Sequence, residues 1–186
     1  MSNSTAIVST CLPDDWRVFS LTYVPYPTQD GKLLGWTLAL LTLTPIFTIS
    51  SVFTITLVRQ SVRWGLLFVG LILSTVVNTI LKNYVAEPRP EGTFASGYGM
   101  PSDHCQFCGF IIAYGYIPPV LAVIFIALPL AYSRVFLLAH TWAQVRAGML
   151  LGLTLGLELV LVCLPDARGL RRSLPVAVIY RSVHDE

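Results

Sequence analysis

The fold depends on one uncharged stretch, Cys105–Tyr132, which reads CQFCGFIIAYGYIPPVLAVIFIALPLAY. It is long enough for one long helix or for a pair of short helices that turn at Pro118-Pro119. A single helix would place His104 and Arg134 about 45 Å apart, at opposite ends. A pair returns both residues to one end. Proline lacks a backbone donor and restricts the residue before it, so Pro118-Pro119 is a credible turn.

The rest of the chain is also strongly apolar. Of its 186 residues, 54% are hydrophobic and only 12% are charged, with a mean hydropathy of +0.68. Three further stretches without Lys or Arg are each close to the roughly 20 residues that cross a bilayer as helix; they are Leu33–Val58, Trp64–Leu81 and Ala147–Leu164. The sequence therefore predicts an all-α integral membrane protein, a bundle of about five transmembrane helices, with helices three and four short and joined at Pro118-Pro119.

Net charge and basic residues limit the partners and set the orientation. The net charge is only +2 and aromatic residues lie inside apolar runs, so no nucleic-acid partner is expected. Threading five crossings puts residues 1–32 on one face as an N-terminal tail and residues 166–186 on the other. Six arginines flank that second face: Arg59, Arg63, Arg168, Arg171, Arg172 and Arg181. By the positive-inside rule this face is cytoplasmic, and the membrane domain spans 33–165.

Polar residues form four fragments that the threading brings to the non-cytoplasmic face. The fragments are Lys82 with Arg89-Pro90, Pro101-Ser102-Asp103-His104, Ser133-Arg134, and His140 followed by Gln144. Phosphoryl transfer depends mainly on positioning and charge neutralisation, which cations and backbone donors can supply. The three cations therefore indicate a phosphate site, with Arg89 and Arg134 suited to bidentate contact.

Other residues in these fragments fit the same chemistry. Ser102 precedes an apolar run and is expected to cap its helix, where the free N–H groups bind anions. His104 and His140 are two of only three histidines in the chain. Imidazole is suited to nucleophilic attack and proton transfer near neutral pH. We expect the two histidines to divide these roles. No metal ligand set is required, and Cys105 and Cys108 are expected to be packing residues.

The fragments resemble the three signatures of the type 2 phosphatidic acid phosphatase superfamily, K-x6-RP, PSGH and SR-x5-H-x3-D. Within it, the segments 98–107 and 133–145, with Trp16 and Tyr26-Pro27, resemble the dolichyldiphosphatase family. The resemblance runs from about Trp16 to Gly148.

The resemblance implies hydrolysis of dolichyl diphosphate to dolichyl phosphate and inorganic phosphate, without a cofactor, in support of protein N-glycosylation. His140 would form a phosphohistidine and His104 would protonate the leaving lipid phosphate. The residues implied to hold phosphate oxygens are Lys82, Arg89, Ser102 and Arg134. The implied location is the endoplasmic reticulum membrane, with a lumenal active site and a cytoplasmic C-terminus.

Two positions depart from the general pattern. Gln144 replaces the usual aspartate, and its carbonyl can accept the imidazole N–H of His140 from the same helical face. Asp103 replaces a small residue and places a carboxylate beside the phosphate site. It is expected to point away from the phosphate, or else to weaken binding or pair with His104.

Two alternatives remain open on sequence grounds. One keeps the mechanism but changes the substrate, as a broader lipid phosphate phosphatase or an undecaprenyl diphosphate phosphatase. The other is a catalytically silent membrane protein that binds lipid phosphate, which Asp103 keeps open. The sequence does not indicate an oligomeric state.

Overall fold

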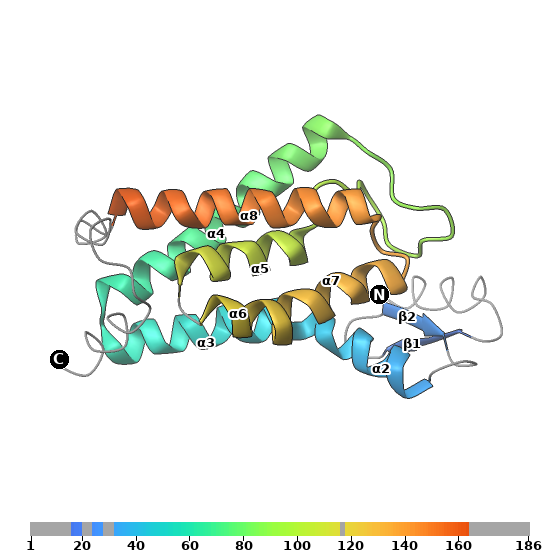
Figure 1. The fold of residues 1–186 in the computed structure, drawn as a ribbon, viewed down its shortest axis with the longest axis horizontal. Helices are drawn as coiled ribbons and strands as arrows, with labels where there is room; N and C mark the ends of the chain where they lie inside the picture. Colours follow the sequence, from blue (N-terminus) through green and yellow to red (C-terminus); the bar gives the residue numbers. More distant parts are fainter. Residues whose placement is uncertain (1–15, 20–23, 28–31, 116–117, 164–186) are drawn as a thin grey trace, which may run out of the picture.

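The computed structural model describes residues 16–19, 24–27, 32–115 and 118–163, which form a helical bundle with a small N-terminal hairpin (Figure 1). The elements in chain order are β1 (Trp16–Phe19), β2 (Val24–Pro27), α2 (Lys32–Leu40), the 3-10 turn η1 (Leu41–Leu43), α3 (Thr44–Arg59), α4 (Val62–Val85), α5 (Asp103–Tyr114), α6 (Pro119–Ala122), the π-helical segment η2 (Val123–Ala127), α7 (Leu128–Phe136) and α8 (Trp142–Cys163). The expected all-α membrane architecture is confirmed, and the chain is a multi-pass membrane protein. The C-terminal tail 166–186 and its arginines lie outside the described residues.

Three helical spans are long and apolar enough to cross a membrane: Leu33–Arg59, Val62–Val85 and Trp142–Val162. The first combines α2, η1 and α3. Its 3-10 turn immediately precedes Thr44 and Pro45, which begin α3, so the chain continues as helix across the proline. At the other end of α3, Gln60 adopts a left-handed conformation with φ 48°. This tight connection turns the chain directly into α4.

The predicted pair of short helices is confirmed, although its two arms differ in length. Helix α5 ends at Gly115, whose φ of 72° favours glycine. Pro119 then begins the returning arm, which runs through η2 to Phe136. At 1.5 Å per residue, α5 is about 18 Å long and the returning arm about 27 Å. The arms differ in length because Gly115 ends the first helix before the prolines.

Helices α5 and α8 pack backbone to backbone along a glycine seam, formed by Gly109 of α5 and Gly148, Gly152 and Gly156 of α8. A Cβ atom added at Gly152 would overlap the carbonyl oxygen of Gln106, and one at Gly148 would overlap that of Ser102. Small residues at such spacing allow membrane helices to approach closely. The seam therefore fixes the start of α5 against the start of α8.

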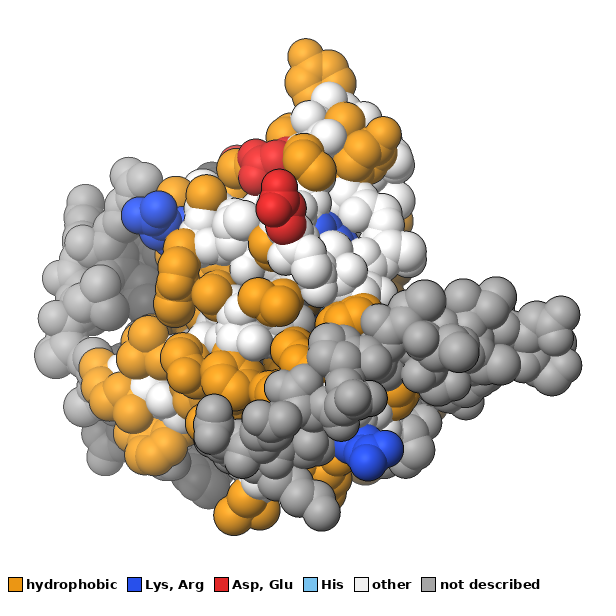
Figure 2. All heavy atoms as spheres, turned by 90° about the vertical axis from the view of Figure 1, so that its right-hand side faces the viewer, with side chains coloured by type: hydrophobic (Ala, Val, Ile, Leu, Met, Phe, Trp, Pro, Cys, Tyr) orange, Lys and Arg blue, Asp and Glu red, His pale blue; other side chains and the backbone are white. Residues whose placement is uncertain are grey.

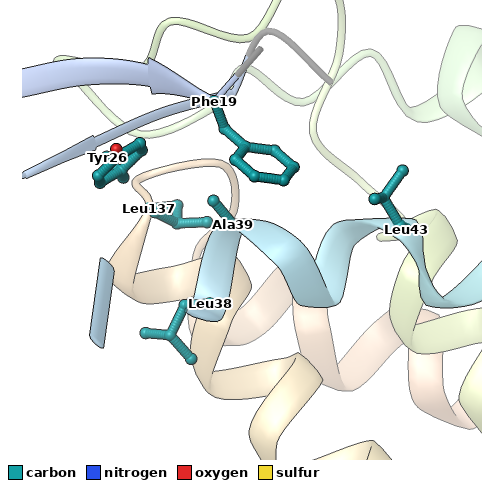
Figure 3. Close-up of a cluster of buried hydrophobic side chains, with 6 residues drawn as sticks. All are labelled: Phe19, Tyr26, Leu38, Ala39, Leu43 and Leu137. Carbon is teal, nitrogen blue, oxygen red and sulfur yellow. The ribbon is translucent and has the colours of Figure 1, made fainter. Parts of the chain in front are cut away.

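The strands β1 and β2 form an antiparallel hairpin that covers α2, a feature that the sequence analysis did not predict. Trp16 pairs with Pro27 and Phe19 with Val24. Phe19 and Tyr26 belong to a buried cluster with residues of α2 and η1 and with Leu137, which follows α7 (Figure 3). Prolines are unfavourable in strands, so β2 gave little signal. The hairpin lies within the expected tail 1–32 and covers the end of the bundle that carries the polar fragments.

All four polar fragments lie at one end of the bundle, the right-hand end in Figure 1. They occupy the end of α4, the connection from 86 to 102, the start of α5, the end of α7, the connection from 137 to 141 and the first turn of α8. Arg59 and Arg63 lie at the opposite end, where α3 meets α4. The topology that a pair of short helices implies is therefore the one observed.

Candidate active site

The candidate site lies where these connections meet. Figure 2 views this end of the molecule and shows basic and acidic side chains close together among hydrophobic ones, one basic side chain being recessed. Its centre is His140, which is 4% exposed and sits in the connection between α7 and α8. The backbone N–H of His140 donates to the carbonyl of Arg134 over 3.1 Å, which fixes the connection against the end of α7.

The two ring nitrogens of His140 have different partners. Nδ1 lies 2.9 Å from the carbonyl oxygen of Gly99 and 3.3 Å from Oε1 of Gln144. Both partners are acceptors, so the proton belongs on Nδ1. Nε2 lies 3.3 Å from Nη1 of Arg89, which can only donate. The lone pair of Nε2 therefore faces the basic group of the site.

Burial and charge keep His140 neutral. Burial, together with the positive charges of Arg89, Lys82 and Arg134, lowers the pKa of His140 from 6.5 to about 3. A neutral imidazole is the nucleophilic form. The same effect places all three predicted cations within electrostatic range of His140.

Arg134 is buried at the end of α7, 4% exposed. Its Nε donates to the hydroxyl of Ser133 over 3.2 Å, whereas its Nη2 is buried without a hydrogen-bond partner among the residues that the structure describes. A buried guanidinium nitrogen without a partner is costly, and a phosphate oxygen is a strong acceptor for it. The donor set of Arg134 therefore fits an anionic ligand.

Lys82 and Asp103 form an ion pair across α4 and α5. The ion-pair partner of Asp103 is therefore Lys82 and not His104. Its charge also reaches Arg89: burial lowers the pKa of the Arg89 guanidinium, and Asp103 acts in the opposite direction. The carboxylate thus partly neutralises the basic group.

Ser102 occupies the N-cap position of α5, as predicted, and is fully buried. Its side chain makes no capping hydrogen bond, so the expectation that its hydroxyl caps the helix is wrong. Its backbone N–H donates to the carbonyl of Gln144 over 3.1 Å. This bond and the glycine seam hold Ser102 against the start of α8.

His104 lies on the first turn of α5, and its Nε2 is 3.2 Å from the carbonyl oxygen of Thr42 in η1. Since a carbonyl only accepts, Nε2 carries the proton and Nδ1 is the nitrogen available for proton exchange. Thr42, in the first membrane crossing, therefore orients His104. His104 and His140 lie at the same end of the bundle.

Gln144 is fully buried and bonded at every polar atom. It forms a capping box with Thr141: its N–H donates to Oγ1 of Thr141 and its Oε1 accepts from the N–H of Thr141, both over 3.2 Å. Its Nε2 donates to Oε1 of Glu87 over 2.9 Å and to the carbonyl of Pro88 over 2.7 Å. Sequence analysis missed Glu87, Gly99 and Thr141, although the T-x-x-Q pattern at 141–144 was a signal for the capping box.

Within the described part of the chain, no three His, Cys, Asp or Glu side chains converge in a way that could hold a metal ion. Cys105 and Cys108 are free and buried, as packing residues are. The cationic set of Lys82, Arg89 and Arg134 is the charged group that faces His140.

Comparison with known proteins identifies the family of this chain. The model of the PAP2 superfamily matches residues 63–167. Dolichyldiphosphatase 1 of Homo sapiens is 34% identical over 166 residues, covering 76% of this chain and 69% of that protein. Dolichyldiphosphatase 1 of Dictyostelium discoideum is 37% identical over 159 residues, covering 74% and 69%. Lipid phosphate phosphatase gamma of Arabidopsis thaliana is 30% identical over 162 residues, covering 76% and 71%.

A solved structure shares the fold. It is the transmembrane PAP2 type phosphatidylglycerolphosphate phosphatase from Bacillus subtilis, with a TM-score of 0.56 and 19% sequence identity, covering 67% of this chain and 75% of that one. The matched family region contains every polar fragment of the site, from Lys82 to Gln144. The chain therefore belongs to the PAP2 superfamily and, within it, to the dolichyldiphosphatase family of membrane phosphatases.

Proposed function

We propose that this chain hydrolyses dolichyl diphosphate to dolichyl phosphate and inorganic phosphate, with His140 as the nucleophile. The observation that carries the proposal is the hydrogen-bonding geometry of His140, which assigns the ring proton to Nδ1. Its Nδ1 proton is held by the carbonyl of Gly99 at 2.9 Å, so that Nε2 presents a lone pair toward Arg89. A fixed tautomer beside cations is what attack on a phosphate requires.

The reaction proceeds in two displacements. Nε2 of His140 attacks the terminal phosphorus, and the bond from that phosphorus to the bridging oxygen breaks. His104 enters this step as the imidazolium, protonated on both ring nitrogens, and gives its Nδ1 proton to the departing lipid phosphate while Nε2 keeps its proton on the Thr42 carbonyl. It then takes a proton from water, which attacks the phosphohistidine and releases inorganic phosphate. Lys82, Arg89 and Arg134 bind the phosphate oxygens, with the N-terminus of α5 at Ser102 as a further donor.

The names of the relatives support the proposed substrate, and the positions of two arginines support the proposed compartment. The relatives named dolichyldiphosphatase support a polyprenyl diphosphate substrate, and a role in recycling the lipid carrier of protein N-glycosylation follows from that substrate. Arg59 and Arg63 lie at the end of the bundle opposite the site, which supports a cytoplasmic position for that end. The site then opens to the lumen of the endoplasmic reticulum, with a cytoplasmic C-terminus.

The test is phosphate release by purified protein from dolichyl diphosphate, with phosphatidic acid and undecaprenyl diphosphate in parallel. We expect wild type to prefer the polyprenyl diphosphates and His140→Ala to lose phosphate release and acid-labile phosphoprotein together. His184→Ala, at the third histidine of the chain, is the matched control. Turnover by His140→Ala at the wild-type rate would refute the assigned nucleophile.

A second candidate is a protein that binds lipid phosphate without turnover. The ion pair of Asp103 with Lys82 favours it, because the pair occupies one of the three cations. It predicts no phosphate release by wild type and a gain of turnover on Asp103→Ser, which the same assay measures.

A further inference from the structure

Beyond the residues proposed to contact the phosphate, the site contains a partly buried polar chain behind His140. The chain starts at the carboxylate of Glu87, in the connection between α4 and α5, and continues through the side chain of Gln144. Gln144 Nε2 donates to Glu87 Oε1 over 2.9 Å, and Gln144 Oε1 lies 3.3 Å from His140 Nδ1. Glu87 occupies one of the six unspecified positions of the K-x6-RP signature, which gives it no role.

Glu87 also positions the other acceptor of the Nδ1 proton. Its backbone carbonyl accepts from the N–H of Gly99 over 2.8 Å, and the carbonyl of Gly99 accepts from His140 Nδ1 over 2.9 Å. A Cβ atom at residue 99 would overlap the amide of Gln144, so only glycine lets the two acceptors lie side by side. Both contacts of His140 Nδ1 therefore lead back to Glu87.

The orientation of Gln144 is fixed independently of His140. The capping box with Thr141 and the bond from Nε2 to the carbonyl of Pro88 leave its amide one orientation, with the oxygen toward His140 and the nitrogen toward Glu87. An amide flipped end for end would set its oxygen against two acceptors. The carboxylate of Glu87 thus acts on His140 only through this amide.

The charge of Glu87 is not neutralised by an ion pair: in the described segments, the one ion pair is that of Lys82 with Asp103. Arg89, two residues along the chain, directs its Nε to the carbonyls of Ser96 and Gly97, each over 3.2 Å. A negative charge that polarises an amide increases the acceptor strength of the amide oxygen. The negative charge of Glu87 therefore stabilises a positive charge on the imidazole of His140.

We propose that Glu87 is the positioning residue that supplies negative charge to His140, through Gln144, as the imidazole becomes positively charged in bond formation. When Nε2 bonds to phosphorus, the ring keeps its Nδ1 proton and gains a positive charge. Glu87, Gln144 and the Gly99 carbonyl together stabilise that charge. The inference rests on the proposed function, because it requires His140 to be the nucleophile.

The test uses isosteric substitutions in the full-length protein, assayed with dolichyl diphosphate. Glu87→Gln keeps the shape and the acceptor but removes the charge, and we expect kcat to fall about tenfold with KM within twofold, since the charge acts on the phosphorylated imidazole rather than on the bound substrate. Glu91→Gln, at an exposed position of the same connection, is the matched control and should behave as wild type.

A charge-swap pair separates this role from a purely structural one. Gln144→Glu alone places a carboxylate against the carboxylate of Glu87, and we expect it to lose most activity. The double variant Glu87→Gln with Gln144→Glu restores a donor facing an acceptor, and it should be at least tenfold more active than Gln144→Glu alone. If the double variant shows only the product of the two single effects, or if Glu87→Gln matches wild type in kcat, the proposal is overturned.

Two controls distinguish loss of the Glu87 role from a failure to fold and from a failure of the proposed function. Size-exclusion profiles in detergent identify variants that fail to fold; in that case Glu87→Asp, which retracts the carboxylate by one methylene, must lower kcat, and an unchanged kcat refutes the role. If His140→Ala retains turnover, the proposed function fails whatever Glu87 does. If His140→Ala is inactive and Glu87→Gln is equal to wild type, the role of Glu87 alone fails.

Discussion

Asp103 gives the sharpest prediction about substrate affinity. It is ion-paired with Lys82, and its charge also reaches Arg89, so two of the three cations are partly neutralised before a phosphate binds. Asp103→Asn removes the charge and keeps the shape. Lys82 is then free for the phosphate, and the repulsion between the carboxylate and the phosphate disappears. We therefore expect a lower KM with little change in kcat.

The magnitude follows from Coulomb's law. Two unit charges about 6 Å apart interact by about 0.7 kcal/mol in water and by about 2.8 kcal/mol at an effective dielectric constant of about 20. The Asp103 side chain is 46% exposed and that of Lys82 16%, so solvent screens the interaction and the lower part of this range applies. A gain of about 1 kcal/mol corresponds to a fall in KM of about fivefold.

The assay is phosphate release from dolichyl diphosphate at low and high salt, for wild type, Asp103→Asn and Asp103→Ser. The difference in KM should shrink at high salt, because ions screen partly exposed charges. A KM that stays unchanged or rises in both variants would refute the reasoning. It would mean that Asp103 serves to hold Lys82 in position and does not compete with the phosphate for it.

Three further predictions follow from the described structure. Gly152→Leu should lower the melting temperature of the detergent-solubilised protein by several degrees or prevent its recovery, because the added side chain would meet the carbonyl of Gln106. Gly65→Ala, whose Cβ would lie 3.8 Å from Thr56, should leave the melting temperature unchanged. A stable Gly152→Leu protein would contradict the packing of α5 on α8. In ¹⁵N NMR spectra, the imidazole of His140 should remain neutral at pH 5 and gain a proton only as the pH falls toward about 3. Protonation with a midpoint near 6.5 would contradict the burial of this ring. Phosphate release should persist in excess chelator, since Lys82, Arg89 and Arg134 supply positive charge, and strict Mg²⁺ dependence would count against this use of the cations.

The sequence was sufficient for the topology because two strong constraints acted together. The lengths of the apolar stretches predicted the membrane crossings. The need to bring His104 and Arg134 to one end of the bundle favoured a pair of short helices over one long helix. The boundaries were less accurate, since Gly115 and not the prolines ends α5. The hairpin of β1 and β2 gave no usable pattern because its strands are only four residues long and contain two prolines.

For the site, the sequence predicted the charged and nucleophilic side chains but not what orients them. Lys82, Arg89, Arg134 and His140 carry chemistry that is visible in residue type and spacing. The orientation of His140 depends instead on the backbone carbonyl of Gly99, which no residue type reveals. It depends also on Gln144, whose partner Glu87 lies 57 positions away in sequence. Contacts of this kind arise only when the chain has folded.

The glycine seam has a consequence for how this chain tolerates change over evolutionary time. Where two backbones touch, any added side chain must displace one of them, and displacement would pull Ser102 away from the start of α8. Lipid-facing positions such as Phe125 and Leu150, 70% and 63% exposed, carry no such constraint. We expect lineages to exchange their membrane-facing residues freely while the four glycines hardly vary, so that the slowest-changing part of the protein includes residues that never meet the substrate.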